Sequence, residues 1–319
     1  MNITVIGCGR WGTFIAWYLD KLNHKVTLYG RENSAHMKEL AARGGNGLVR
    51  LSERIELTVS LSNIHKSDTI IISIDSQNLQ NLMGQLSHCN VQNKIIVLCM
   101  KGLEADTGRR LSQIASDAVD STNRIAVWLG PGHVQEFSQG IPNCMVIDSA
   151  DIQVKTKLVE AFSSDLIRFY YGQDLIGNEI GAASKNVIGI AAGMLDGLHL
   201  STLKGALMSR GTREIARMIS AMGGSELTAY GLCHLGDYEA TVFSQFSHNR
   251  KFGESFILHE DYPELAEGCY AVKALVVLGR EYHVDLPICN AVYDVLYHGK
   301  DAKSTLDELF TRSLKNEFQ

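Results

Sequence analysis

The feature that most constrains the fold is the glycine-rich segment GCGRWG at residues 7–12, which directly follows the β-branched run ITVI. A strand that leads through such a turn into a helix is the setting in which this pattern binds a dinucleotide. Gly7 permits the tight turn, Gly9 lets the backbone approach a pyrophosphate, and Gly12 allows close helix packing. The helix N-terminus supplies amide donors for the anion. The segment therefore predicts a Rossmann-type unit at the start of the chain, with a glycine-rich turn of no function as the alternative.

The first half of the chain continues this alternation of short apolar runs and helical stretches. The runs at residues 69–74 and 95–100 lack in–out alternation, as expected for strands that helices cover on both faces. Further strands are predicted at residues 25–30, 125–128, 143–147 and 167–171. The fold class is predicted as α/β, with a Rossmann-like, doubly wound parallel sheet over residues 1–176.

From about residue 178 onward, β-branched runs give way to stretches with Ala, Leu, Met and Gly at helical spacing. A chain of 319 residues also exceeds the size at which a single hydrophobic core stops growing. We therefore predict an all-α C-terminal domain over residues 177–319 that binds substrate and carries the catalytic groups.

Composition excludes several function classes. The formal net charge of -5 disfavours a nucleic-acid partner, since phosphate-tracking surfaces need clustered Lys and Arg. The seven cysteines show no CxxC pair and no Cys/His ligand spacing, which predicts free thiols, no metal site and a cytoplasmic location. No apolar run is long enough to cross a membrane, so a membrane partner is not expected.

The end of the second predicted strand, LYGRE, bears on cofactor choice. NAD enzymes usually carry an acidic ribose ligand at this distance, whereas NADP enzymes often carry Arg. Arg31 could bind a 2′-phosphate in bidentate fashion, which favours NADP as the cofactor. Glu32 keeps NAD open, and a solvated helix-start residue is the plain alternative for Arg31.

Two lysines stand where a reaction site would use them. Lys101 follows an apolar strand at the carboxyl edge, where open α/β sheets bind ligands. Lys185 is the one cation in the small and apolar stretch EIGAASKNVIGIAAGML. Burial there would lower its pKa towards the range useful for proton transfer to a carbonyl oxygen. A surface residue for Lys101 and a lysine that extends to solvent from a helix face for Lys185 are the alternatives.

Two further segments carry candidate ligand-binding groups. The turn WLGPGH brings the amides of Gly130 and Gly132 close to a bound substrate, unless it is only structural. Asp237 precedes a polar, basic loop, which we predict to be the chain's best anion pocket. Its residues are Ser247, His248, Asn249, Arg250 and Lys251. A solvated charge run is the usual alternative.

Taken in order, the motifs resemble those of the bacterial glycerol-3-phosphate dehydrogenases over nearly the whole chain. They are GCGRWG, SQ at residues 76–77, CMKGLE, LGPGHVQEF, EIGAASKNVIGIAAG, GDYEAT, HNRKFG, EGCYAVKAL and LPICNAVYDVLY. The resemblance implies reversible reduction of dihydroxyacetone phosphate to sn-glycerol 3-phosphate by NAD(P)H, with a phosphorylated ketone as the small-molecule partner. It also implies a homodimer.

The resemblance assigns roles residue by residue. Lys185 matches the catalytic lysine and acts together with Asp237. Substrate-binding positions are Lys101, Gly130, Gly132, Asp237, Thr241, Ser247, His248 and Asn249. Cofactor-binding positions are Gly7, Gly9, Arg10, Trp11, Gly12, Arg31, Glu32, Lys101, Val134, His248, Leu265 and Glu267.

Two departures from the family pattern concern the substrate. His248 stands where the family has a phosphate-binding Arg, which exchanges a permanent bidentate cation for a titratable ring unless Arg250 or Lys251 replaces it. Asp75 stands where the family has a proline. Two other interpretations therefore stay open: a dehydrogenase of the same fold that acts on another keto substrate, and a non-catalytic NADP-binding regulatory protein.

Overall fold

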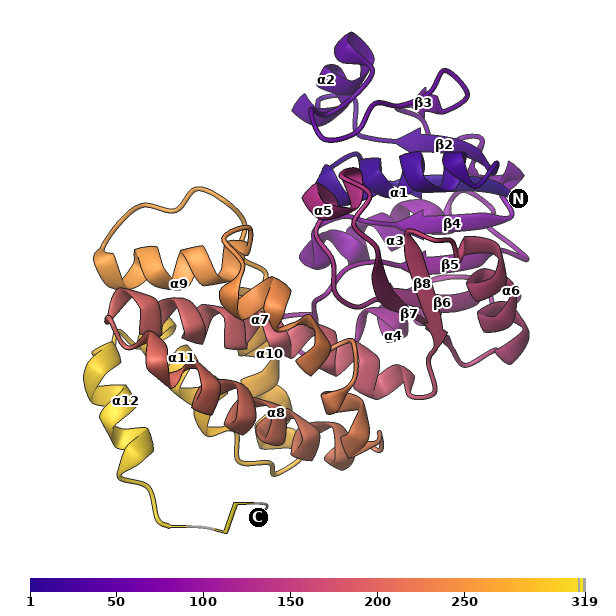
Figure 1. The fold of residues 1–319 in the computed structure, drawn as a ribbon. Coiled ribbons are helices and arrows are strands. Elements are labelled where there is room, and N and C mark those ends of the chain that lie inside the picture. The colour runs from indigo at the N-terminus through magenta and orange to yellow at the C-terminus, as the bar shows by residue number, and fades with distance from the viewer. Residues whose placement is uncertain (315, 318–319) are drawn as a thin grey trace. The chain divides into compact units, whose positions relative to one another are not determined.

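The computed structural model describes residues 1–314, 316 and 317, and its N-terminal half forms an eight-stranded sheet (Figure 1). The strand order is β3-β2-β1-β4-β5-β6-β7-β8, so the order reverses between β1 and β4. The strands are β1 (Asn2–Ile6), β2 (Lys25–Tyr29), β3 (Glu56–Thr58), β4 (Thr69–Ile72), β5 (Ile95–Leu98), β6 (Arg124–Leu129), β7 (Asn143–Ser149) and β8 (Ile167–Tyr171). This reversal is the switch point at which open α/β sheets bind ligands.

The sheet departs from the predicted parallel arrangement at one place. β7 pairs antiparallel with β6, whereas every other neighbouring pair is parallel. Between them lies only the five-residue helix α5 (Val134–Ser138), and an antiparallel neighbour needs no crossover of a dozen residues or more. The sequence analysis also missed β3, because three residues with exposed or half-exposed side chains carry no apolar run.

Helices cover both faces of the sheet. α1 (Arg10–Lys21) and α6 (Ile152–Phe162) share one hydrophobic cluster with Val5, Val97 and Trp128. Alternate strand residues such as Ile70 and Leu98 are also buried and point to the other face. α3 (Leu79–Ser87) and α4 (Leu111–Ala118) cover that face (Figure 1), while α2 (Ala35–Arg43) follows β2. Because helices cover both faces, both sets of alternate strand residues are buried, which explains the uninterrupted apolar runs in the sequence.

The chain divides into two compact units. Unit 1 comprises residues 1–100 and 111–175, and unit 2 comprises residues 101–110 and 176–319. The short segment that begins at Lys101 therefore belongs to the helical unit, although in sequence it follows directly on β5 of the sheet.

Unit 2 is built around α7 (Leu175–Gly197), in which nearly every residue is buried. The other helices are α8 (Lys204–Ala221), α9 (His248–Leu258), α10 (Gly268–Glu281), α11 (Pro287–Tyr297) and α12 (Ala302–Phe310). Shorter turns are η1 (Ile64–Lys66) and η2 (Ser76–Asn78) in unit 1, and η3 (Ser201–Leu203), η4 (Glu226–Tyr230), η5 (Leu235–Asp237) and the π-helix η6 (Glu239–Phe243) in unit 2.

Close backbone approach explains the glycines of α7. A methyl group added at Gly193 would lie 1.9 Å from the carbonyl oxygen of Arg250, and one added at Gly253 would lie 2.2 Å from that of Ile190. α7 and α9 therefore pack with their backbones in contact, which brings the first residues of α9 next to the buried centre of α7.

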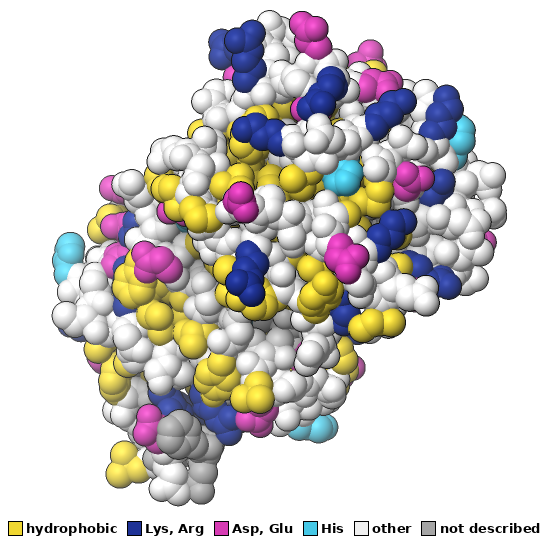
Figure 2. Space-filling model, turned by 45° about the vertical axis from the view of Figure 1, so that its right-hand side comes forward, with side chains coloured by type: hydrophobic (Ala, Val, Ile, Leu, Met, Phe, Trp, Pro, Cys, Tyr) yellow, Lys and Arg dark blue, Asp and Glu magenta, His cyan; other side chains and the backbone are white. Residues whose placement is uncertain are grey.

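The surface mixes charges of both signs. On the face drawn in Figure 2, Lys and Arg side chains alternate with Asp and Glu and form no continuous basic field. Within residues 1–314, 316 and 317, no helix is both long and apolar enough to cross a bilayer. The same residues include no group of three or more His, Cys, Asp or Glu side chains arranged to hold a metal ion.

Candidate active site

Three charged side chains meet in the interior of unit 2. Lys101 Nζ lies 2.6 Å from Asp237 Oδ2, and Lys185 Nζ lies 3.1 Å from the same oxygen. The side chain of Asp237 is 1% exposed and that of Lys185 is 9% exposed, whereas that of Lys101 is 23% exposed. The structure thus brings together three of the residues singled out in the sequence, and one of them is partly open to solvent.

The surroundings of Lys185 suit it to proton transfer. Its pKa is lowered from 10.5 to about 8, mainly because of burial; the carboxylate of Asp237 partly offsets this effect, and the positive charge of Lys101 adds to it. Lys185 Nζ also donates a hydrogen bond of 2.6 Å to Thr241 Oγ1. A lysine with a pKa near the working pH can both give and take a proton, as general acid–base catalysis requires.

The second carboxylate oxygen of Asp237 is available to a ligand. Oδ1 is buried and has no hydrogen-bond partner among the described residues. An unsatisfied buried acceptor costs about 1–3 kcal/mol, so a ligand hydroxyl that donated to Oδ1 would recover this free energy.

Irregular backbone places Asp237 and Thr241. Asp237 ends the turn η5, and Thr241 lies in the π-helix η6, a form that is rare and frequent at functional sites. Thr241 Oγ1 donates to the backbone oxygen of Asp237 at 2.7 Å, so its lone pairs point towards Lys185. One hydroxyl therefore connects the acidic turn to the buried lysine.

Asn186 is a residue that the sequence analysis missed. Its Nδ2 donates to the backbone oxygen of Lys101 at 2.8 Å, and its Oδ1 accepts from Asn249 Nδ2 at 3.0 Å. Asn249 Oδ1 in turn accepts from the backbone N–H of Gly268 at 2.9 Å. This chain of amides positions the backbone of Lys101. In the sequence, the role of Asn186 is signalled only by its position directly after Lys185.

Several side chains of the predicted anion pocket already have partners within the protein. Ser247 is buried and caps α9 by accepting a hydrogen bond from the N–H of Arg250. Arg250 Nη1 lies 2.7 Å from Asp196 and 3.2 Å from Glu254, so two carboxylates already engage the guanidinium. Arg250 would therefore have to leave these carboxylates before it could replace the missing phosphate ligand.

His248 lies at the first position of α9 and is half-buried. Its Nδ1 lies 2.7 Å from the hydroxyl of Tyr262, a second residue that the sequence analysis did not single out. The other predicted contacts in this region are Leu265, which is 46% exposed, and Glu267, which precedes α10.

The dinucleotide segment of unit 1 has the geometry that a pyrophosphate requires. Gly7 has a φ of 111°, and a methyl group added there would lie 2.0 Å from the oxygen of Ser73. A methyl group added at Gly12 would lie 1.8 Å from the oxygen of Gly7, whereas one added at Gly9 meets nothing within 4 Å. The protein itself thus demands Gly7 and Gly12. Gly9 leaves open space at the N-terminus of α1, where a phosphate would fit.

The remaining cofactor candidates lie on the carboxyl side of unit 1 in different environments. The Trp11 ring packs against Phe14, Trp128 and Phe137, with centroid distances of 5.2, 6.4 and 6.2 Å. Arg10 is exposed at the start of α1, Arg31 and Glu32 are exposed after β2, and Val134 is buried at the start of α5.

The turn after β6 needs both of its glycines. Gly130 has a φ of 119° and Gly132 a φ of 140°, values that L side chains rarely adopt. A methyl group on Gly132 would also lie 2.3 Å from the Phe137 ring. The backbone conformation of the turn therefore requires glycine at both positions, whether or not the turn binds a ligand.

Residues 2–155 match the NAD-dependent glycerol-3-phosphate dehydrogenase N-terminus, and residues 174–307 match the C-terminus of the same family. This chain belongs to the NAD-dependent glycerol-3-phosphate dehydrogenase family. The two matches leave residues 156–173, which include β8, and the last residues of the chain outside them.

Members of the glycerol-3-phosphate dehydrogenase family align over the full length. A glycerol-3-phosphate dehydrogenase [NAD(P)+] of Fusobacterium nucleatum is 34% identical and covers 100% of this chain and 99% of its own. That of Pelodictyon phaeoclathratiforme is 32% identical and covers 99% of each chain. The crystal structure of glycerol-3-phosphate dehydrogenase from Coxiella burnetii superposes with a TM-score of 0.91 at 27% identity, covering 98% of this chain and 99% of that one.

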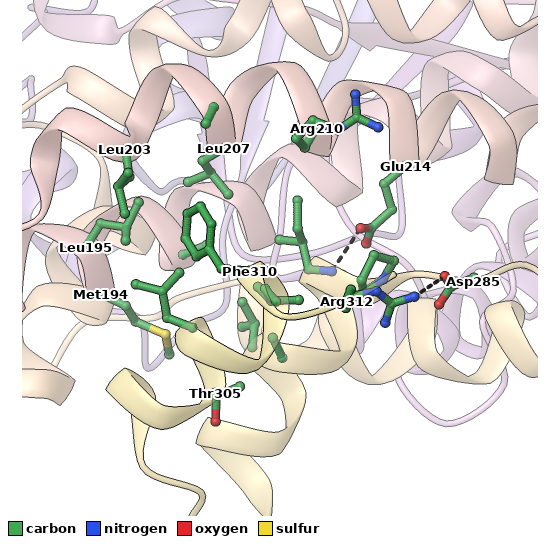
Figure 3. A pocket seen from close by; sticks show the side chains of 18 of the residues that line it. Met194, Leu195, Leu203, Leu207, Arg210, Glu214, Asp285, Thr305, Phe310 and Arg312 are labelled. Atoms are coloured by element: carbon green, nitrogen blue, oxygen red, sulfur yellow. Dashed lines mark hydrogen bonds and ion pairs between the residues drawn. The ribbon is translucent and has the colours of Figure 1, made fainter. Parts of the chain in front are cut away.

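A separate cavity of about 440 Å³ lies in unit 2 among α7, α8, α11, α12 and the residues after α12 (Figure 3). Apolar side chains such as Met194 and Leu207 form one part, and Arg210, Glu214 and Asp285 lie in another. Lys101, Lys185 and Asp237 are not among its lining residues. The charged cluster described above, and not this cavity, is therefore the candidate active site.

Proposed function

We propose that this chain reduces dihydroxyacetone phosphate to sn-glycerol 3-phosphate with NADPH or NADH, and catalyses the reverse reaction. The observation that carries the proposal is the buried Lys185, whose pKa is lowered to about 8 while it contacts Asp237 and Thr241. A ketone reduction needs one proton donor at the carbonyl oxygen, and the family membership of the chain supplies the substrate class.

Unit 1 would hold the nucleotide. The open space at Gly9 and the N-terminus of α1 suit the pyrophosphate, and exposed Arg31 suits a 2′-phosphate. When bound, the cofactor supplies the hydride that reduces the ketone carbon. Residues proposed to contact it are Gly7, Gly9, Arg10, Trp11, Gly12, Arg31, Glu32, Lys101, Val134, His248, Leu265 and Glu267.

The lysines of unit 2 would handle the proton and the charge. Lys185 in its ammonium form donates one proton to the ketone oxygen as the carbon accepts the hydride, which leaves an alcohol and a neutral lysine. In the reverse direction neutral Lys185 takes the hydroxyl proton. The partly exposed Lys101 would stabilise negative charge on the substrate, and this electrostatic preorganisation needs no rearrangement during the reaction.

Asp237 would orient the substrate. Its buried Oδ1 can accept a hydrogen bond from the free hydroxyl of dihydroxyacetone phosphate, while Oδ2 stays with the two lysines. Gly130, Gly132, Thr241, Ser247, His248 and Asn249 complete the proposed substrate contacts. We also propose a cytoplasmic location, which the free thiol state of all seven cysteines supports.

The deciding experiment measures oxidation of NADPH and of NADH by the purified protein, with dihydroxyacetone phosphate in one arm and unphosphorylated dihydroxyacetone in the other. Efficient turnover of the phosphate ester alone is the expected result. Because His248 stands where a permanent cation is expected, a less anionic ketone is the second candidate, and equal turnover of both ketones would favour it. Cofactor binding without oxidation by any ketone would contradict both.

A further inference from the structure

A buried histidine connects the two sides of the candidate active site. His234 is fully buried, and its Nδ1 lies 2.9 Å from the backbone oxygen of Gly181 and 3.3 Å from Ser184 Oγ, both in α7. Its Nε2 lies 2.7 Å from the hydroxyl of Tyr238. His234, Ser184 and Tyr238 have no role in the proposed proton transfer.

The partners determine which nitrogen carries the proton. A backbone carbonyl oxygen can only accept, so Nδ1 must hold the hydrogen that points to Gly181. In the neutral ring Nε2 is then an acceptor, and the hydroxyl of Tyr238 donates to it. Burial lowers the pKa of His234 to about 4, which keeps the ring in this neutral form at physiological pH.

The placement of this network relative to the catalytic pair is specific. Gly181 lies one helical turn before Lys185 on the same face of α7, since residues four apart are neighbours on a helix. His234 lies three residues before Asp237, and Tyr238 directly follows Asp237. The histidine therefore joins α7 to the η5 turn one step away from the ion pair between Lys185 and Asp237.

We propose that His234 is a positioning residue that holds Asp237 next to Lys185 in both protonation states of the lysine. The ion pair with Lys185 attracts Asp237 towards α7 only while Lys185 is charged, and the proposed reaction makes Lys185 neutral once per turnover. The other ion pair of Asp237, with Lys101, joins it to the segment of residues 101–110 and not to α7. The hydrogen bond from His234 to Gly181 does not depend on that charge. It keeps Asp237 in place until the lysine is protonated again. This inference rests on the proposed function.

Loss of this brace has a predictable electrostatic consequence. Asp237 raises the pKa of Lys185, so a displaced carboxylate lets that pKa fall. The other ionisable groups near the network are Lys101, which acts on Lys185, and Glu214 and Cys289, which act on Tyr238. These groups remain in every variant below, so a change in the pH profile is assigned to the histidine.

Three variants separate positioning from general stability. His234→Leu fills the space but removes the donor to Gly181. His234→Asn places an amide N–H near the position of Nδ1 and so keeps a donor to Gly181. Tyr238→Phe removes the donor to Nε2 but leaves the bond to Gly181 intact, and it is the matched control for loss of a buried hydrogen bond. Should His234→Leu fail to fold, His234→Gln, whose amide lies one carbon farther out, replaces it.

The first readout is the pH profile of kcat for ketone reduction. His234→Leu is expected to lower kcat by roughly 10- to 100-fold, as a misplaced catalytic group does. It should also move the alkaline fall of activity about one pH unit lower. His234→Asn is expected to restore the wild-type profile, and Tyr238→Phe to keep it while lowering the urea midpoint of unfolding. An unshifted profile in His234→Leu, or a shifted one in His234→Asn, overturns the proposal.

The second readout does not need turnover. The pH dependence of covalent modification of the Lys185 amine by an amine reagent, located by mass spectrometry, reports its pKa in each variant. If the midpoint of Lys185 modification lies near pH 8 in the wild-type protein and at lower pH in His234→Leu, the positioning role holds even for a protein that reduces no tested ketone. If turnover is normal but the two proteins modify alike, His234 has only a structural role.

Discussion

Lys185 Nζ and Asp237 Oδ2 lie 3.1 Å apart in the interior of unit 2, with side-chain exposures of 9% and 1%. Breaking such a buried pair leaves an uncompensated charge, which is costly. The pair is buried rather than a contact on the surface, and the proposed proton transfer by Lys185 depends on it.

Lys185→Met should remove the proton donor while keeping the length and apolar stem of the side chain. Turnover with dihydroxyacetone phosphate should fall by roughly 100- to 10,000-fold, the usual contribution of a positioned acid or base. NADPH affinity, measured by fluorescence titration, should change little. Substantial residual turnover in a correctly folded variant would contradict the assigned role.

The pH dependence of the two directions should be opposite. Ketone reduction needs the ammonium form of Lys185, so its kcat should fall as pH rises through about 8. Alcohol oxidation needs the neutral amine, so its kcat should rise over the same interval. Both limbs are measured with saturating cofactor and substrate, and limbs of the same sign would exclude Lys185 as the group that transfers the proton.

Arg31→Ala should discriminate between the two cofactors. Arg31 is exposed after β2, and loss of a charge-assisted bond to a 2′-phosphate costs about 1.5–3 kcal/mol, or roughly 10- to 100-fold in affinity. NADPH binding should weaken by this factor, while NADH binding should not. Arg43→Ala, which removes an exposed arginine of α2, serves as the control for general charge effects. Equal losses for NADPH and NADH would mean that Arg31 does not contact a 2′-phosphate.

His248→Arg tests the proposed role of His248 in phosphate binding. A permanent guanidinium should tighten binding of the phosphorylated ketone by about tenfold if the pocket otherwise matches that ligand. Tyr262→Phe, which removes the hydroxyl partner of His248, tests whether the ring must be held in place. Weaker binding in His248→Arg would favour a ketone other than the phosphate ester.

Glu214→Ala should destabilise the helical unit without a direct effect on chemistry. Glu214 accepts hydrogen bonds from the backbone N–H groups of Ile288 at 2.8 Å and Cys289 at 2.9 Å, and so caps α11 (Figure 3). Its loss should lower the free energy of unfolding by about 1–3 kcal/mol, as urea denaturation would show. Glu281→Ala, at the exposed end of α10, should leave it nearly unchanged.

Much of the architecture could be predicted because it depends on local patterns. The apolar runs at β4 and β5 signal strands covered on both faces, and the glycines at residues 7–12 signal a turn from strand to helix. The small and apolar residues around Lys185 signal a buried helix with one costly charge. In each case neighbours in sequence are also neighbours in space, so the sequence carries the information.

The site itself could be predicted only in part. The residue types of Lys101, Lys185 and Asp237 pointed to proton transfer and anion binding. Nothing in the sequence, however, places both lysines next to the same carboxylate oxygen of Asp237. Asn186 escaped notice because its importance lies in a hydrogen bond to the backbone of Lys101, 85 positions away. The strand β7 was predicted but its antiparallel direction was not, because strand direction depends on which neighbour the strand meets, and an apolar run reads the same in both directions.

The sequence by itself therefore determined the class of fold, the glycine-rich turn after β1 and the residue types that we propose to take part in the reaction, because each rests on residue type and spacing. The tertiary structure alone decided that the segment beginning at Lys101 joins the helical unit, that Arg250 is already held by Asp196, and that His234 joins Gly181 to the turn of Asp237. These outcomes depend on packing and hydrogen bonds between distant parts of the chain. The ion pairs and hydrogen-bond partners at the site follow from those contacts, and no local pattern encodes them.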